Sequence, residues 1–205
     1  MEDLTRCSEL AEQAWPVRER LSRPRDEPSM MKPWIESSHF SATWSEVAVA
    51  SGEVVGFLFG SIDKQMPKRA AVEAVTDQFW MFRRFLSRDV NRLDLPLSAL
   101  LGFLFMEFKL AVNRPDADAE IILVIVATSF RGKGVGKTLV DRFVKAARDS
   151  GASAILLYTD DRTSNWRFYE HYGFRKVSTF YDNISSFFAG ERANAIYYVL
   201  DLGKK

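Results

Sequence analysis

The segment Glu120–Lys137, EIILVIVATSFRGKGVGK, decides the fold of this chain. Its first part, Ile121–Val126, is an unbroken aliphatic run, which is typical of a strand covered on both faces of a sheet. A polar turn and a loop with alternating glycines follow, and apolar residues then recur at helical spacing as far as Gly151. The segment therefore predicts a buried strand, a glycine loop and an amphipathic helix, in that order.

The loop combines backbone freedom with positive charge. Glycine permits a positive φ and close backbone approach, and the helix that follows presents unpaired N–H groups and a partial positive charge at its start. The glycines are Gly132, Gly134 and Gly136, and the cations interleaved with them are Arg131, Lys133 and Lys137. An ordinary turn from strand to helix needs no such combination. The loop therefore predicts a phosphate-binding site, in particular one for a pyrophosphate.

Two other classes of glycine loop fit less well. A phosphate-loop nucleotide hydrolase requires GxxxxGK[ST]; Gly136-Lys137-Thr138 supplies its end, but its first glycine falls on Arg131. The apolar run Ile155–Asp160 ends in an acid, as the metal-binding strand of that class does, and keeps the hydrolase as an alternative. A dinucleotide-binding GxGxxG loop needs a glycine at position 137, where Lys137 stands.

The pattern that fits without a gap is [Q/R]xxGx[G/A], at Arg131–Gly136. It resembles the coenzyme A pyrophosphate loop of the GCN5-related N-acetyltransferase (GNAT) superfamily. About 30 residues further on, Asn165–Phe174 reads NWRFYEHYGF; it shares the asparagine, Phe-Tyr-Glu and Gly-Phe of the family pattern NxxAxxFYExxGF, with a shorter spacing after the asparagine. The two elements in this order across one β-α-β unit are specific. The resemblance covers residues 120–201 well and residues 44–62 loosely.

The resemblance implies an α/β fold, with a mixed, twisted β-sheet flanked by helices. A length of 205 residues, of which 47% are apolar, suits a single domain over residues 1–205. Residues 63–118 fall outside the resemblance, and we expect them to form a helical insertion between the third and fourth strands of the family fold. Within it, one helix is expected after Asp77 and another from about Ala99 to Ala111. The insertion is interpreted as packing on the sheet, with a lid over an apolar acceptor pocket or a homodimer contact as alternatives.

Periodicity predicts the remaining elements. An amphipathic helix is expected from Leu4 to Leu21, with a break at Pro16, followed by an irregular loop over residues 23–38. A β-hairpin is expected about Ser51-Gly52. Three closing strands are expected at residues 175–181, 185–189 and 195–201. The strand with which family members usually begin is missing from the pattern.

By resemblance, the glycine loop binds the pyrophosphate of acetyl-CoA, the expected cosubstrate. The loop residues implied are Arg131, Gly132, Lys133, Gly134, Val135, Gly136, Lys137 and Thr138. The fourth and fifth strands of the family splay apart, so main-chain groups of Val124 and Val126 are expected to meet the pantetheine arm and the oxyanion. Asn165 is expected to contact the same arm, and its alternative role is the N-cap of the helix that follows.

Two residues are candidates for the chemistry. Tyr169 matches the family tyrosine that protonates the departing thiolate, and a phenol with a pKa near ~10 suits that role. Tyr172, on the same helix, is expected to be an aromatic core residue. Glu120 stands at the offset from the loop at which the histone-acetylating branch of the family carries its catalytic glutamate. It is the candidate base, and its alternative is a solvated residue at the end of a strand.

The chain is therefore interpreted as an N-acetyltransferase that acts on a primary amine, of a small molecule or a protein, in a ternary complex. A non-catalytic acyl-CoA-binding or interaction protein and a phosphate-loop nucleotide hydrolase are the alternatives. No group of residues has metal-ligand spacing, so no metal is expected. The lone histidines His39 and His171 are interpreted as surface or packing residues.

Composition limits the partners. A formal net charge of +1 disfavours nucleic acid. The longest apolar stretch, Leu95–Val112, is interrupted by Glu107 and Lys109, which makes a membrane helix unfavourable. A single cysteine, Cys7, excludes an internal disulfide, and the acidic, polar start lacks the features of a signal peptide. We therefore expect a cytoplasmic protein.

Overall fold

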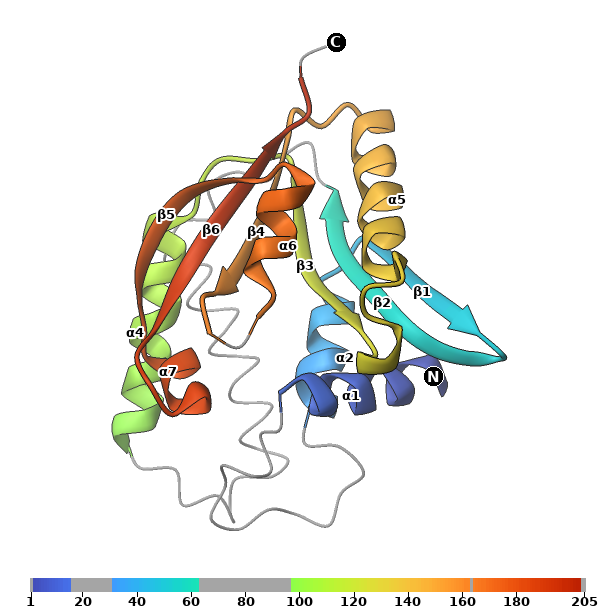
Figure 1. The fold of residues 1–205 in the computed structure, drawn as a ribbon. Helices are drawn as coiled ribbons and strands as arrows, with labels where there is room; N and C mark the ends of the chain where they lie inside the picture. Colours follow the sequence, from blue (N-terminus) through green and yellow to red (C-terminus); the bar gives the residue numbers. More distant parts are fainter. Residues whose placement is uncertain (1, 16–30, 63–96, 163, 204–205) are drawn as a thin grey trace.

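The computed structural model describes residues 2–15, 31–62, 97–162 and 164–203 (Figure 1). Their centre is a six-stranded sheet in the order β1-β2-β3-β4-β6-β5. The strands are β1 (Trp44–Ala50), β2 (Glu53–Ile62), β3 (Ala119–Val126), β4 (Ala154–Asp160), β5 (Arg175–Asp182) and β6 (Ala193–Asp201). Neighbouring strands are antiparallel except β3 and β4, which are parallel. The expected mixed α/β architecture is confirmed.

Helices cover both faces of this sheet (Figure 1). One face carries α5 (Val135–Asp149) and α6 (Trp166–Tyr172). On the other face, α1 (Glu2–Ala14) and α2 (Lys32–Phe40) lie under β1–β3. The helices α4 (Leu97–Asn113) and α7 (Asn183–Ala189) lie beside β4–β6. Side chains that alternate along β2 separate the two faces. Leu58 belongs to the core cluster with α5, whereas Phe57 and Phe59 belong to the cluster with α1 and α2.

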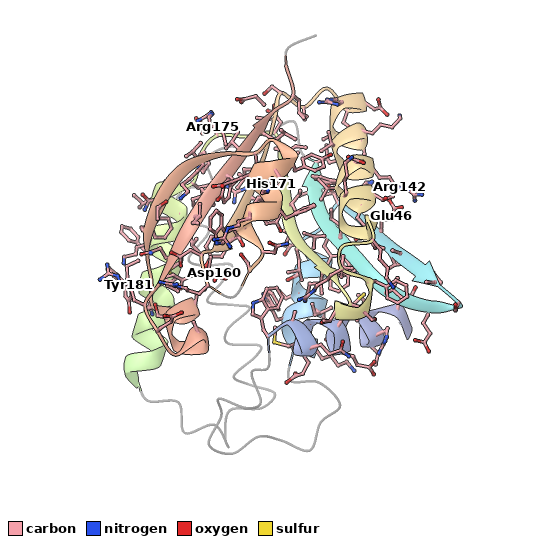
Figure 2. The ribbon with its side chains drawn as sticks, viewed as in Figure 1. Glu46, Arg142, Asp160, His171, Arg175 and Tyr181 are labelled. Carbon is pink, nitrogen blue, oxygen red and sulfur yellow. The ribbon has the colours of Figure 1, made fainter. Side chains whose placement is uncertain are left out.

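The position of α5 on the sheet is set by Phe143. Its side chain is fully buried, and its ring centroid lies 5.2 Å from that of Trp44. A Cβ at Gly60 of β2 would stand 2.3 Å from the Phe143 ring, so a side chain at that position would lift α5 off the sheet. The next residue, Arg142, forms an ion pair with Glu46 of β1 (Figure 2). These contacts hold the helix whose first turn follows the glycine loop.

Most of the expected elements are confirmed. The hairpin of β1 and β2 turns at Ser51 and Gly52, whose φ angles of 52° and 82° suit a type I′ turn. The helix from about Ala99, the strand from Arg175 and the final strand are present as α4, β5 and β6. Within the described residues no strand precedes β1, and α1 ends at Ala14, ahead of Pro16. The helix expected after Asp77 lies outside the described residues.

The irregular loop expected over residues 23–38 is wrong for its last part. Lys32–Phe40 is the helix α2, with Pro33 in its first turn. Proline is tolerated there because the first N–H groups of a helix have no intrahelical partner. Ile35 is fully buried under the sheet, which supplies the tertiary contact that favours a helix in this short segment.

The strand expected at residues 185–189 is also wrong, because Asn183–Ala189 forms α7. The buried carboxylate of Asp182 accepts hydrogen bonds from the Ser185 backbone N–H (2.9 Å) and the Ser185 hydroxyl (2.7 Å). A side-chain acceptor that bonds an N–H of the first turn favours a helix start. The apolar residues of this segment were misread because a short apolar run fits a strand and a helix equally well.

None of the described helices is long and apolar enough to be a candidate membrane span.

Candidate active site

The glycine loop joins β3 to α5. After the 3₁₀ turn Thr128–Phe130, Gly132 and Gly134 adopt left-handed φ angles of 74° and 84°, which disfavour any residue with a Cβ. Gly134 is the N-cap of α5, and the Thr138 N–H makes the first helical bond, to the Gly134 carbonyl at 2.9 Å. The N–H groups of residues 135–137 therefore stand at the open start of a helix, where an anion binds favourably.

The three cations of the loop are exposed and have separate contacts. Arg131 Nε donates to the Val126 carbonyl at 3.2 Å. Lys133 Nζ lies 4.9 Å from the centroid of the Phe130 ring. Lys137 Nζ lies 2.7 Å from a carboxylate oxygen of Asp141, one helical turn later. Gly136, the third glycine, has no left-handed φ; a Cβ there would stand 3.5 Å from Val126 Cγ2, an ordinary van der Waals contact.

β3 and β4 separate just above the start of the two strands. They pair only over Ala119–Ile121 and Ile155–Leu157, although β3 stays paired with β2 as far as Val126 and β4 with β6 as far as Asp160. Figure 1 shows the two strands diverging toward the loop. In the described residues, the facing edges of β3 and β4 beyond this point carry no strand-to-strand pairing. The expected splay of these two strands is confirmed.

A β-bulge lies at this point of separation. On β2, Gly60 and Phe59 are adjacent, but their partners on β3 are Ile121 and Leu123, so Ile122 is the extra residue. A bulge reverses which side chains face each side of a sheet. Ile121 and Val124 consequently both pack toward α5, although they lie three positions apart along the strand, and Leu123 packs toward α1 and α2.

The backbone of Val124 and Val126 faces the opening between the strands. The Ala127 N–H donates to the Val55 carbonyl of β2 at 2.9 Å. Successive residues of a strand direct their N–H and C=O groups to opposite edges, so Val126 and Val124 present theirs toward β4. The Val126 carbonyl is the one that Arg131 contacts.

The segment Asn165–Phe174 contains the short helix α6. Asn165 is its N-cap residue, and the Phe168 N–H donates to the Asn165 carbonyl at 3.0 Å. No side-chain capping bond from Asn165 is present among the described residues, so its N-cap position is confirmed but a capping amide is not. The exposed Asn165 side chain stays a predicted cofactor contact.

Tyr169 lies on the α5 face of the sheet. Its ring packs against Phe168, Phe174 and Tyr198, with centroid distances of 5.3, 5.9 and 6.3 Å. Burial raises the pKa of its phenol above the ordinary value. Among the described residues its hydroxyl makes no hydrogen bond, whereas the Tyr198 hydroxyl donates to Glu170 at 2.9 Å. Tyr169 is thus protonated at neutral pH and its proton is not committed to a neighbour.

Tyr172 differs from the core residue that we expected. Its ring packs on the same core cluster, but its hydroxyl donates to Asp141 Oδ1 of α5 at 2.6 Å. The sequence offered a partial signal for this contact, because Lys137 and Asp141 have the i, i+4 spacing of a helical ion pair. Nothing in the sequence indicates that Tyr172 joins them.

Glu120 lies at the point where β3 and β4 separate, paired in register with Leu156. Its neighbours Ala119 and Ile121 face α5, so its side chain lies on the opposite face of the sheet from Tyr169. Both carboxylate oxygens accept hydrogen bonds from Arg114, at 3.0 and 2.7 Å. The side chain is only 19% exposed, so the alternative of a solvated residue is wrong.

Comparison with known proteins agrees with this geometry. Residues 99–174 match the Acetyltransferase (GNAT) family. The matched residues include the glycine loop and α6. Mycothiol acetyltransferase of Rhodococcus opacus (strain B4) is 29% identical over 118 residues, which are 57% of this chain and 36% of that protein. A second mycothiol acetyltransferase, of Rhodococcus jostii (strain RHA1), is 28% identical over the same shares, so the chain matches about a third of the length of these curated relatives.

Solved GNAT-like structures share the fold. An aminoglycoside 6'-N-acetyltransferase complexed with coenzyme A has a TM-score of 0.57 at 14% identity, over 98% of this chain and 92% of that one. An N-acetyltransferase from Staphylococcus aureus Mu50 has a TM-score of 0.55 at 16% identity, over 98% and 94% of the two chains. At such identities the likeness concerns the fold alone.

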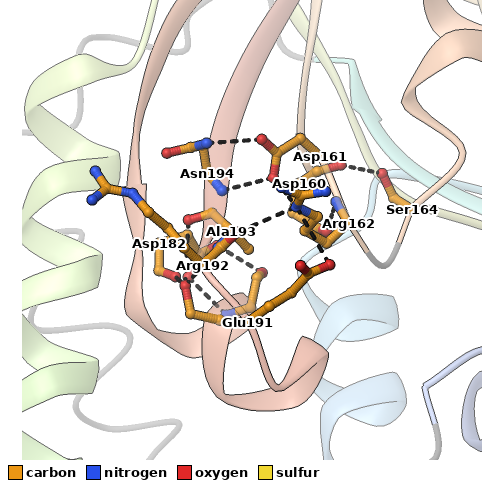
Figure 3. A network of polar contacts seen from close by, with 11 residues as sticks. Asp160, Asp161, Arg162, Ser164, Asp182, Glu191, Arg192, Ala193 and Asn194 are labelled. Atoms are coloured by element: carbon orange, nitrogen blue, oxygen red, sulfur yellow. Dashed lines mark hydrogen bonds and ion pairs between the residues drawn. The ribbon is translucent and has the colours of Figure 1, made fainter.

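In this chain the exit of β4 is held by a polar network that the sequence does not predict (Figure 3). Asp161 accepts bonds of 2.8 Å from both the backbone and the side-chain nitrogen of Asn194. Arg162 donates to the Arg192 carbonyl at 3.2 Å and lies 3.6 Å from Glu191. The network ties the segment that leads from β4 into α6 to the start of β6. It therefore holds Asp161 and Arg162 at the exit of β4.

No group of three or more His, Cys, Asp or Glu side chains is placed to hold a metal ion in the part of the chain that the structure describes.

Proposed function

We propose that this protein transfers the acetyl group of acetyl-CoA to a primary amine by direct transfer in a ternary complex. The observation that supports this proposal is the arrangement of three features. The exposed, cationic glycine loop leads into the start of α5, at the end of β3 where β3 and β4 have separated. The helix α6, with Tyr169, lies on the same face of the sheet as α5. A phosphate site, a free strand edge and a phenol on one side of the sheet suit a coenzyme A thioester.

The loop Arg131–Thr138 is proposed to bind the pyrophosphate, through the N–H groups at the start of α5 and the exposed cations. The edge of β3 at Val124 and Val126 is proposed to bond the pantetheine amides as an added strand would, and to donate to the oxyanion. Asn165, at the start of α6, would contact the same arm from the β4 side. In this arrangement Val124 and Val126 would bind the cofactor from the sheet, and the other residues would bind it from the glycine loop, the start of α5 and the start of α6.

In the proposed reaction the amine nitrogen attacks the thioester carbonyl, a C–N bond forms and the C–S bond breaks. Tyr169 gives its proton to the thiolate that leaves, and a base takes a proton from the nitrogen. Glu120 is the proposed base. Tyr169 packs on the α5 face of the sheet, and Glu120 lies on the opposite face where β3 and β4 separate. A thioester that enters the opening is proposed to have the donor on one side and the acceptor on the other.

The ion pair with Arg114 limits this role of Glu120. Both oxygens of the Glu120 carboxylate accept hydrogen bonds from the guanidinium, which therefore competes with an amine for them. If Glu120 acts as the base, the Arg114 pair loosens when the acceptor binds; if it does not, the pair fastens the segment after α4 to β3. The two roles are separable by experiment.

The acceptor is proposed only as a primary amine of a small molecule or a protein. The relatives differ in what they are named for, mycothiol in one case and an aminoglycoside in another. A panel of amines, from polyamines and amino sugars to peptides with a free N-terminus, offered with acetyl-CoA and followed by release of free coenzyme A thiol, tests the proposal. Thiol release that depends on one amine supports it. Tight acetyl-CoA binding with no amine-dependent release would indicate a non-catalytic binder.

A further inference from the structure

Asp141 of α5 connects the glycine loop to the helix that carries Tyr169. Its Oδ2 lies 2.7 Å from Lys137 Nζ, one turn earlier in the same helix. Its Oδ1 accepts a 2.6 Å hydrogen bond from the Tyr172 hydroxyl of α6. The two oxygens of one carboxylate therefore bind two different elements of the proposed site.

Tyr172 in turn shares its neighbours with Tyr169. Phe168 lies 5.3 Å from Tyr169 and 6.1 Å from Tyr172, measured between ring centroids. Phe174 lies 5.9 Å from Tyr169 and 5.8 Å from Tyr172. The two tyrosines thus pack on the same pair of rings. A shift of Tyr172 changes the surroundings that orient the Tyr169 phenol.

α6 packs on the core through its aromatic side chains, but in the described residues it has few other polar anchors. It has seven residues, none of them fully buried, and its N-cap Asn165 makes no side-chain capping bond. Glu170 fastens it to the sheet through the hydroxyl of Tyr198 at 2.9 Å. His171 is exposed, and its ring nitrogen Nδ1 contacts the Arg167 carbonyl within the helix (Figure 2). Between α6 and α5, the bond from Tyr172 to Asp141 is the side-chain hydrogen bond seen in the described residues, and Lys137 Nζ also lies 5.7 Å from the centroid of the Tyr172 ring.

The same carboxylate acts on the loop electrostatically. Hydrogen bonds from Lys137 and Tyr172 hold the pKa of Asp141 below its ordinary value, so it is ionised at neutral pH. Lys137 stands in the first turn of α5, where the loop presents its N–H groups. A negative charge one turn away opposes an incoming phosphate and competes with it for the Lys137 ammonium.

We propose that Asp141 is a positioning residue with two separable effects: it restrains Lys137 and so weakens the binding of cofactor phosphates, and through Tyr172 it holds α6 so that Tyr169 is oriented for turnover. The inference rests on the proposed acetyltransferase function. It identifies neither Asp141 nor Tyr172 as a group that touches the reacting atoms.

Two substitutions separate the two effects. Asp141→Asn removes the charge but keeps an oxygen that accepts from Tyr172, whereas Tyr172→Phe removes the hydroxyl but keeps the Lys137 pair. Asp149→Asn is the matched control for the charge, because Asp149 forms the same i, i+4 pair with Lys145 further along α5. Tyr181→Phe, on the exposed face of β5, is the matched control for the hydroxyl.

For Asp141→Asn we expect acetyl-CoA to bind about threefold to tenfold more tightly by calorimetry at low salt, with the gain disappearing at high salt. The kcat should change by less than about twofold, because α6 is still held. For Tyr172→Phe we expect an unchanged Kd and a kcat about tenfold lower, because a small displacement of a reacting group has a large effect on the rate. Amide exchange in α6 should be faster in Tyr172→Phe than in the wild type or Tyr181→Phe.

A change in binding alone for one variant and in turnover alone for the other is not expected of residues that only stabilise the fold. An Asp141→Asn protein with wild-type affinity, or one matched by Asp149→Asn, overturns the effect on the loop. A Tyr172→Phe protein with wild-type exchange in α6 and wild-type kcat overturns the effect on Tyr169. A wild type that fails to bind acetyl-CoA refutes the proposed function instead. Calorimetry and amide exchange need no acceptor, so the inference is decided even where no amine is turned over.

Discussion

At the scale of single residues, the tyrosines of this chain differ in what their hydroxyls do. Those of Tyr172 and Tyr198 donate to carboxylates, whereas that of Tyr169 makes no hydrogen bond to a described residue. Burial keeps Tyr169 protonated well past neutral pH by raising its pKa. A retained and uncommitted proton is what a general acid requires.

Tyr169→Phe should lower kcat by roughly 10²-fold and leave the Kd for acetyl-CoA nearly unchanged, because the ring and its packing remain and only the donor is lost. Steady-state kinetics and calorimetry measure the two quantities. Tyr181→Phe deletes a hydroxyl from an exposed tyrosine and should leave both at wild-type values. Equal turnover of the Tyr169→Phe and wild-type enzymes would mean that water protonates the thiolate.

The substitution Glu120→Gln tests whether Glu120 acts as the base or only as the ion-pair partner of Arg114. If Glu120 is the base, the acidic limb of the pH dependence of kcat/KM should disappear and kcat should fall by about 10²-fold or more. If it only pairs with Arg114, the melting temperature should fall, because the guanidinium loses its charged partner in a partly buried site, while the pH profile keeps its shape. Arg114→Met controls for the second case, since it removes the pair and leaves the carboxylate.

A functional residue could be identified from the sequence where the pattern that indicates it lies in its own segment of the chain. The loop glycines were predictable because a left-handed φ is a property of the residue itself, and Gly132 and Gly134 both adopt one. Tyr172 was not, because its partner Asp141 lies 31 positions away on another helix. Arg114 lies near Glu120 in the sequence, but the irregular segment between α4 and β3 that brings the two side chains together has no periodicity from which the contact could be predicted.

At the scale of elements, the loop and α5 act as one unit. Gly134 is at once the last loop residue and the N-cap of the helix, with a φ of 84°. Its backbone conformation therefore sets the direction in which the first N–H groups point. A Cβ at this position would meet no atom within 4 Å, so the effect of a substitution comes from the backbone alone.

Gly134→Val should weaken acetyl-CoA binding at least about tenfold, because a β-branched residue is unfavourable by about 1–2 kcal/mol or more in the left-handed region and the loop would rearrange to avoid it. Gly52→Val is a matched control: Gly52 has a φ of 82° and equally open surroundings, but it lies in the β1–β2 turn. The control should lose stability and keep its affinity. Wild-type binding by a folded Gly134→Val protein would contradict the phosphate cradle.

Elements were predicted well where periodicity is long and poorly where it is short. The amphipathic helix expected after the glycine loop is confirmed as α5, whose buried positions Leu139, Val140, Phe143, Val144 and Ala147 recur at helical spacing. The helices α2 and α7 have only nine and seven residues, and each is stabilised by a contact that its own sequence pattern does not show. For α2 this is the burial of Ile35, and for α7 the bonds that Asp182 accepts.

At the scale of the whole molecule, the order of strands follows from the β-α-β unit, but the opening between β3 and β4 does not. Both strands are aliphatic runs that suit full pairing, and they pair over only three residues each. The bulge at Ile122 and the network at the exit of β4 lie at the two sides of the opening, and neither leaves a mark in the sequence pattern. The opening exists only in the assembled sheet. A ligand that binds in the opening therefore binds the folded chain and not the unfolded one, and should stabilise the whole fold.

Acetyl-CoA should therefore raise the melting temperature, because it binds the assembled loop and strand edge and not the unfolded chain. At a concentration of 100 times Kd, binding adds about 2.7 kcal/mol to the free energy of unfolding, which for a chain of this size corresponds to roughly 5–10 °C. ATP with magnesium should have a much smaller effect, since Arg131 replaces the first glycine of a nucleotide-binding loop. Gly134→Val should lose most of the shift with acetyl-CoA, and Gly52→Val should keep it. A larger shift with ATP and magnesium than with acetyl-CoA would favour the nucleotide hydrolase that shares the end of this loop.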